Sequence, residues 1–115
     1  MTADEAMRRI DLLLSHVWVV RTFLKHSEES EEDPGVMEVV RDLYDCCLAV
    51  GPAWTAQDSA EYLKVVGKKI GKLRQATERF AELQPSISVH TNFKMAVTSL
   101  RTAVGDIGDA LANVA

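Results

Sequence analysis

Apolar residues recur three or four positions apart in four separate stretches of the chain. This is the spacing that places side chains on one face of an α-helix, and no stretch alternates in the manner of a β-strand. The spacing predicts helices over residues 3–26, 34–50, 58–83 and 88–113. The apolar stripe of the first helix consists of Ala6, Ile10, Leu13, Val17, Val20 and Leu24. The later stripes are Val36, Val40, Leu43, Cys47 and Val50, then Leu63, Val66, Ile70, Leu73, Thr77 and Phe80, then Phe93, Val97, Leu100, Val104, Ile107, Leu111 and Val114.

Proline and glycine separate these stretches at Pro34-Gly35, Gly51-Pro52 and Gln84-Pro85. Thr2 and Glu5 have the spacing of a capping box at the start of the first helix. The segment 27–33 is so acidic that we expect a loop outside the core. Four helices with near-heptad stripes and short connections predict an all-α fold, an antiparallel (up-down-up-down) four-helix bundle formed by residues 1–115 as one domain.

The first predicted helix carries a second apolar stripe on the side away from its core stripe. Leu12, His16, Val19 and Phe23 recur at intervals of four, three and four. One interpretation is that loops or wide packing bury both sides of the helix. The other is an interface with a second copy or with a partner protein, since a second apolar face on a soluble chain suggests that another protein surface covers it. If His16 lies at a two-fold interface, we expect association to weaken below about pH 6, where imidazole takes up a proton.

The third predicted helix contains the basic stretch 64–74, which at first sight resembles a phosphate-binding loop. Its glycines are one residue too close together, no hydroxyl residue follows the lysine, and the helical spacing continues through both glycines, so that motif is excluded. Gly67 and Gly71 instead predict a smooth groove that receives a neighbouring helix, or else exposed positions at which glycine is simply tolerated. Lys64, Lys68 and Lys72 form one stripe that we expect to contact the acidic segment or an acidic partner. Nucleic acid is the less favoured occupant, because no aromatic residues interleave with the lysines.

Two histidine-containing segments resemble known motifs. Arg21 and His26, with four residues between them, resemble the Arg-x(4–6)-His signature of HEPN-type bundles, many of which are ribonucleases. The resemblance covers six residues and implies that the arginine would steady phosphate charge while the histidine assists proton transfer. In that family the arginine is often followed by Asn or Asp, whereas Thr22 follows here. The simpler interpretation, which we favour, is that Arg21 extends from the bundle end and His26 interacts with the helix C-terminus.

The second segment begins at His90, which is followed four positions later by Lys94. Histidine phosphotransfer bundles have a similar length, and their motif reads His-x-x-Lys-Gly. Here the lysine is one position later and Met95 stands where the glycine would follow. We therefore favour a partly buried histidine at the start of the last helix, with a phosphotransfer module as the weaker alternative.

Composition narrows the function further. The 115 residues have a net charge of −4 and a pI near 5.3, which argues against a general nucleic-acid binder.

No apolar run is long enough for a transmembrane helix, and the acidic N-terminal segment is unlike a signal peptide. Adjacent Cys46 and Cys47 indicate buried thiols in a reducing cytoplasm. No Glu-x-x-His, His-x-x-x-His or Cys-x-x-Cys motif is present, so we expect no metal and no cofactor. The sequence predicts a cytoplasmic bundle that acts by protein–protein interaction, as a homo-oligomer or accessory subunit, and not by catalysis.

Overall fold

The computed structural model describes all residues from 1 to 115, and every regular element in it is an α-helix. The prediction of an all-helical fold without strands is confirmed. The helices are α1 (Ala3–Lys25), α2 (Glu28–Glu31), α3 (Pro34–Ala49), α4 (Gly51–Thr55), α5 (Ser59–Ile87) and α6 (Thr91–Ala112).

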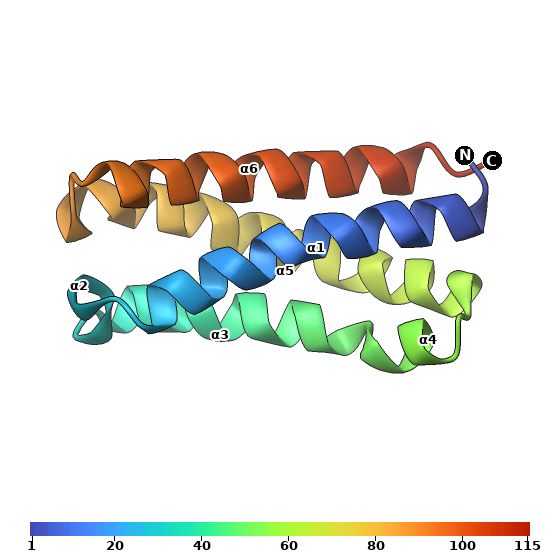
Figure 1. The fold of residues 1–115 in the computed structure, drawn as a ribbon, viewed down its shortest axis with the longest axis horizontal. Helices are drawn as coiled ribbons and strands as arrows, with labels where there is room; N and C mark the ends of the chain where they lie inside the picture. The colour runs from blue at the N-terminus through green and yellow to red at the C-terminus, as the bar shows by residue number, and fades with distance from the viewer.

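The molecule is elongated, with extents of 42 × 22 × 18 Å. The long helices α1, α3, α5 and α6 lie side by side along its length, and the short helices α2 and α4 lie at opposite ends (Figure 1). Both termini lie at the α4 end. There the Met1 ammonium donates to the Asn113 carbonyl at 2.8 Å, and the Ala115 N–H donates to the Met1 carbonyl at 2.8 Å.

Side-chain caps begin the helices where the sequence indicates them. The Thr2 hydroxyl accepts from the Glu5 N–H at 3.1 Å, and the Glu5 carboxylate accepts from the Thr2 N–H at 3.2 Å, which confirms the predicted capping box. Asp33 caps α3 and Asp58 caps α5 in the same way, each through a carboxylate that accepts a backbone N–H three residues on. These caps satisfy backbone donors that no helical carbonyl can reach.

The acidic segment is more ordered than a loop. Residues Glu28–Glu31 form the single turn α2, and Ser30 within it is completely buried. Its hydroxyl accepts a hydrogen bond from the Ser27 hydroxyl, which satisfies a polar group that burial would otherwise leave unpaired. The expectation that this whole segment lies outside the core was therefore wrong for Ser30, although the glutamates around it are exposed.

The two helix ends predicted from proline have different outcomes. The helix predicted to end at residue 50, before Pro52, is α3, which ends at Ala49, so that boundary is confirmed within one residue. The helix predicted to end at residue 83 continues through Pro85 to Ile87, so that boundary was wrong. Pro85 removes one backbone donor, a small loss so close to the helix end. The last turn is held by the Ser88 N–H, which donates to the Gln84 carbonyl at 3.1 Å, and by the Gln84 amide, which donates to the Ser88 carbonyl at 2.8 Å. Pro52 in turn opens the short helix α4, because proline is tolerated in a first turn.

The core runs the length of the long helices and includes most of the predicted stripe residues. The stripe residues that are only partly buried are Cys47, Leu63, Ile70, Val97, Leu111 and Val114. Tyr62 is completely buried, whereas Leu63 beside it is only partly buried. The Tyr62 hydroxyl donates to the Asp11 carboxylate of α1 at 2.8 Å, and the ring packs edge-on against Trp54. Because its polar end has a partner, the aromatic ring can be buried at little cost.

Candidate functional site

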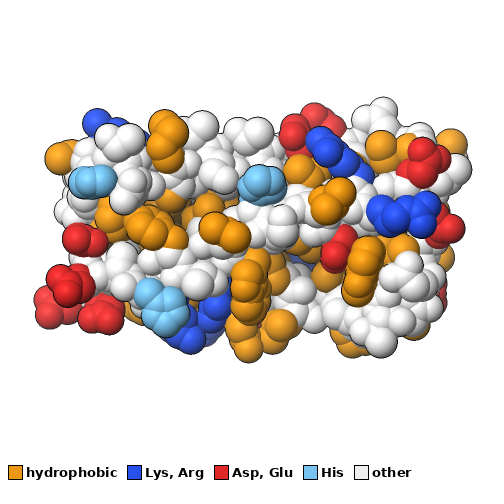
Figure 2. All heavy atoms as spheres, viewed as in Figure 1, with side chains coloured by type: hydrophobic (Ala, Val, Ile, Leu, Met, Phe, Trp, Pro, Cys, Tyr) orange, Lys and Arg blue, Asp and Glu red, His pale blue; other side chains and the backbone are white.

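The second apolar stripe of α1 points into solvent over most of its length. Leu12 is 66% exposed, Val19 is 64% exposed, and His16 between them is exposed as well. We call these three residues the α1 face. In Figure 2, α1 crosses the centre of the view, and hydrophobic side chains gather along it. Of the two interpretations of this stripe, burial by loops within the chain does not hold for these residues.

Phe23, the fourth member of the stripe, is different. Its ring packs edge-on against Phe93 of α6, with centroids 5.0 Å apart, and it is partly buried against the core. It closes the gap between α1 and α6 and contributes less open surface than the α1 face. Sequence spacing could not show this, because Phe93 belongs to a distant segment.

A second exposed apolar group lies where α1 meets α3. Trp18 is 40% exposed, Tyr44 is 36% exposed, and their ring centroids are 5.8 Å apart. Leu48, 50% exposed, follows Tyr44 by one helical turn. Sequence reasoning missed Tyr44 and Leu48, although their four-residue spacing was a usable signal.

Arg21 lies beneath these two rings and is only 8% exposed. Its guanidinium carbon is 4.6 Å from the Trp18 ring centroid and 4.8 Å from that of Tyr44. Its only hydrogen bond runs from Nη1 to the Thr22 hydroxyl at 3.3 Å, and its buried Nε has no acceptor. From the sequence we expected this side chain to extend from the bundle end, but it is buried between helices.

A hollow of about 340 Å³ lies beside Arg21. We call it the α1–α3 hollow, and its lining consists of Arg21, Lys25, Met37, Val40, Arg41 and Tyr44. No carboxylate is within salt-bridge distance of its three cationic side chains. Lys25 and Arg41 are exposed, so the hollow is open, positively charged and unpaired.

The structure does not bring Arg21 and His26 together within one chain. Five positions along an α-helix rotate a side chain by about 140°. Arg21 accordingly faces α3, whereas His26 is exposed at the C-cap of α1 and is not part of the α1–α3 hollow.

His90 serves as the N-cap of α6. Its Nδ1 accepts from the Asn92 N–H at 3.0 Å, and the residue is exposed and not partly buried as expected. The expectation failed because α6 begins at Thr91, three residues after the predicted start at residue 88, so the histidine is the exposed N-cap and not a member of the apolar stripe. That hydrogen bond occupies one of the two ring nitrogens.

The predicted lysine stripe is divided. Lys64 and Lys68 are exposed without an ion pair, whereas Lys72 lies 3.5 Å from both Asp42 and Asp45 of α3. Desolvation opposes the charge on Lys72, but the two carboxylates prevail and raise its pKa. Within the chain, no ion pair joins the stripe to the acidic residues 28–33.

The paired glycines do not receive a helix within this chain. A Cβ added at Gly67 or Gly71 would have no atom within 4 Å, so their groove opens to solvent. At Gly108 of α6, an added Cβ would lie 2.5 Å from Nη2 of Arg74, so an arginine from α5 covers that glycine.

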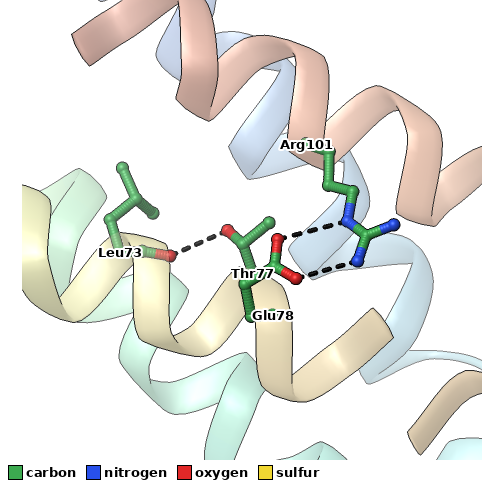
Figure 3. Close-up of polar contacts among 4 residues, drawn as sticks. All are labelled: Leu73, Thr77, Glu78 and Arg101. Atoms are coloured by element: carbon green, nitrogen blue, oxygen red, sulfur yellow. Dashed lines mark hydrogen bonds and ion pairs between the residues drawn. The ribbon is translucent and has the colours of Figure 1, made fainter. Parts of the chain in front are cut away.

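A second hollow, of about 370 Å³, lies between α5 and α6. Figure 3 shows Arg101 bonded through Nε and Nη2 to the two carboxylate oxygens of Glu78, at 3.2 and 2.8 Å. The hydrogen bond from Arg101 lowers the pKa of the Glu78 carboxyl. The Thr77 hydroxyl beside it donates to the Leu73 carbonyl at 2.7 Å. This arginine is therefore already neutralised, unlike Arg21.

The thiols are poor nucleophiles. Burial raises the pKa of Cys46, and burial together with the neighbouring Cys46 raises that of Cys47 to about 12. Both are free, and a thiol becomes reactive only as the thiolate.

No group of three or more His, Cys, Asp or Glu side chains is placed to hold a metal ion. Each helix is too short or too polar to cross a lipid bilayer. No protein-family model, no curated protein and no solved structure matches the chain. We therefore infer the function from the exposed side chains and hollows of the structure.

Proposed function

We propose that this chain acts by protein–protein contact, as a homo-oligomer or an accessory subunit, without catalysis of its own. In this proposal the long helices form an antiparallel four-helix bundle, and the bundle presents the α1 face as its docking surface. The free thiols Cys46 and Cys47 suit a reducing cytoplasm, which is the proposed location.

The main support for this proposal is the exposure of the α1 face to solvent. Leu12 and Val19 are two large aliphatic side chains seven residues apart, and each keeps about two thirds of its surface in water. Trp18, Tyr44 and Leu48 extend the apolar area toward α3. Apolar residues gathered on one face are typical of an interface, since their burial contributes about 25 cal/mol per Å² removed from water.

A second copy of the chain is the simplest occupant. Homodimers with a two-fold axis are the commonest oligomers, and they pair the same patch on both subunits. An exposed aliphatic patch that includes Leu12 and Val19 is compatible with such self-pairing.

The test is Leu12→Glu, alone and with Val19→Glu. Both residues are exposed in the single chain, so the fold should remain intact while a buried glutamate would break the contact. We expect the native chain to show a concentration-dependent mass by sedimentation equilibrium, or to retain a partner from lysate, and the variants to lose it.

Val89→Glu is the matched control. Val89 is 72% exposed but lies in the turn before α6, outside the α1 face. A native chain that stays monomeric at high concentration and retains no partner would contradict the proposal. So would an association that Leu12→Glu and Val89→Glu affect equally.

A further inference from the structure

The guanidinium of Arg21 is a buried charge without an anionic partner. Arg21 is 8% exposed, its Nε has no acceptor, and its single hydrogen bond to Thr22 is long. Removing a charged group from water costs free energy that an ion pair or hydrogen bonds normally offset. Even the exposed Arg101 of the same chain has such a partner, because it donates two hydrogen bonds to the Glu78 carboxylate.

The two aromatic rings hold the Arg21 guanidinium in place but do not accept hydrogen bonds from its N–H groups. Trp18 and Tyr44 attract the guanidinium carbon from 4.6 and 4.8 Å, but ring faces accept no strong hydrogen bonds. Holding a guanidinium in one place reduces the ordering that a ligand would otherwise require. Arg21 is therefore a positioned donor beside an open hollow.

Two more cations converge on that hollow from different helices. Lys25 follows Arg21 by one turn of α1, and Arg41 comes from α3. None of the three has a carboxylate within salt-bridge distance. The lysine stripe of α5 differs in two ways. Lys64 and Lys68 do not line this hollow, and Lys72 is paired with two aspartates.

We propose that the α1–α3 hollow is a binding site for a phosphate group, held by Arg21, Lys25 and Arg41. A phosphate monoester carries between one and two negative charges near neutral pH and offers three acceptor oxygens, which suits several cationic donors better than a single carboxylate does. Arginine in particular bonds phosphate through two parallel N–H groups. The volume of about 340 Å³ leaves room for the group to which the phosphate is attached.

The phosphate can come from a small phosphorylated molecule or from a phosphorylated side chain of a partner protein. The chemistry at the hollow is the same for both. Met37 and Val40 in its lining provide apolar contact to the attached carbon atoms in either case.

The experiment uses the two tryptophans as reporter and internal control. Trp18 contacts Arg21, whereas Trp54 belongs to α4 at one end of the molecule, packs against Tyr62 and does not line the hollow. Inorganic phosphate is titrated into the ¹⁵N-labelled chain at constant ionic strength, with chloride as the balancing anion. We expect the indole N–H resonance of Trp18 to shift to saturation and that of Trp54 to stay in place.

Matched variants locate the site. Lys25→Gln and Arg41→Gln should each weaken phosphate binding about tenfold, the effect of losing one charge-assisted hydrogen bond. Both side chains are exposed, so the fold should tolerate the change. Lys68→Gln removes the same charge from an exposed, unpaired lysine and should leave the affinity unchanged. Leu12→Glu should also leave it unchanged, which separates the hollow from the α1 face.

Several results would overturn the proposal. They are a Trp18 shift that never saturates, an equal shift of Trp54, or an equal weakening by Lys68→Gln, each of which would indicate charge screening alone. Acetate bound as tightly as phosphate would remove the preference for phosphate. A Trp18 shift that depends on protein concentration without phosphate would make carboxylates of a second copy the occupant.

A second titration distinguishes the sources. Glycerol 3-phosphate represents a small molecule, and a phosphoserine peptide is compared with the same peptide carrying glutamate. Tighter binding of the phosphopeptide than of glycerol 3-phosphate supports the site with a protein source, and the reverse supports it with a small-molecule source. Equal binding of the glutamate peptide and the phosphopeptide would contradict it.

Discussion

At the scale of single residues, two buried polar side chains have opposite surroundings. The Tyr62 hydroxyl meets the Asp11 carboxylate, a residue 51 positions away in the chain. Arg21 meets only aromatic rings and a hydroxyl, and its charge is left for something outside the chain. The first arrangement serves stability, whereas the second is typical of a recognition site.

Tyr62→Phe should destabilise the chain by about 1–3 kcal/mol, because it leaves the Asp11 carboxylate without its donor. Urea denaturation with a linear extrapolation measures the free energy of unfolding. Tyr44→Phe is the control, since Tyr44 is partly exposed and its hydroxyl makes no hydrogen bond within the chain. An equal loss in both variants would show that the Tyr62–Asp11 bond contributes nothing specific.

At the scale of helices, local signals account for most of what is observed. The Thr2, Asp33 and Asp58 caps begin helices within a residue or two of their predicted starts. The errors arise where a local signal is outweighed, as at Pro85, where the final turn of α5 is held by Gln84 and Ser88. A proline near a helix end costs one hydrogen bond, and neighbouring contacts can offset that.

Gly67→Ala with Gly71→Ala should stabilise α5 by about 1 kcal/mol per position, because alanine loses less conformational freedom in a helix. An added Cβ meets no atom at either site. Thermal unfolding followed by circular dichroism measures the gain.

Gly35→Ala is the matched control for these glycines. A Cβ at Gly35 would lie 3.0 Å from the Leu83 side chain and 3.1 Å from that of Asp33, so we expect little or no gain. If the double variant is more stable but loses self-association, the two-glycine groove receives a partner helix. If it gains nothing at all, the assignment of open helical positions is wrong.

At the scale of the whole molecule, the packing of four long helices creates faces that no single helix has. The α1 face remains open because α3 and α6 flank α1 without covering its outer side (Figure 1). The α1–α3 hollow exists only because two helices contribute cations to one space.

Stability should fall as the pH rises above about 9. In the folded chain the pKa of Cys47 is raised from its ordinary 9.0 to about 12, and that of Tyr62 is raised as well, both chiefly by burial. The unfolded chain therefore releases protons that the folded chain retains, and alkaline pH favours unfolding. Each such group contributes a loss of about 1.4 kcal/mol per pH unit between its unfolded and folded pKa.

Urea denaturation at pH 7, 9 and 10.5 measures this slope. Cys47→Ala removes one of the groups and should reduce the slope between pH 9 and 10.5, whatever it does to stability at pH 7. A slope that Cys47→Ala leaves unchanged would show that this thiol is not held in its protonated form by burial.

The sequence by itself determined the four long helices, the caps that begin three of them and most of the inner stripes, because these depend on residues within a few positions of one another. The exposure of Leu12, His16 and Val19 also agrees with their place on the second stripe of α1. Only the tertiary structure decided that Phe23 packs on Phe93, that Ser30 and Tyr62 are buried, and that Arg41 of α3 joins Arg21 and Lys25 of α1 in lining the α1–α3 hollow. Those outcomes depend on how far each helix is rotated against its neighbours. The rotation is set by packing between segments that are distant along the chain, and no local pattern carries that information.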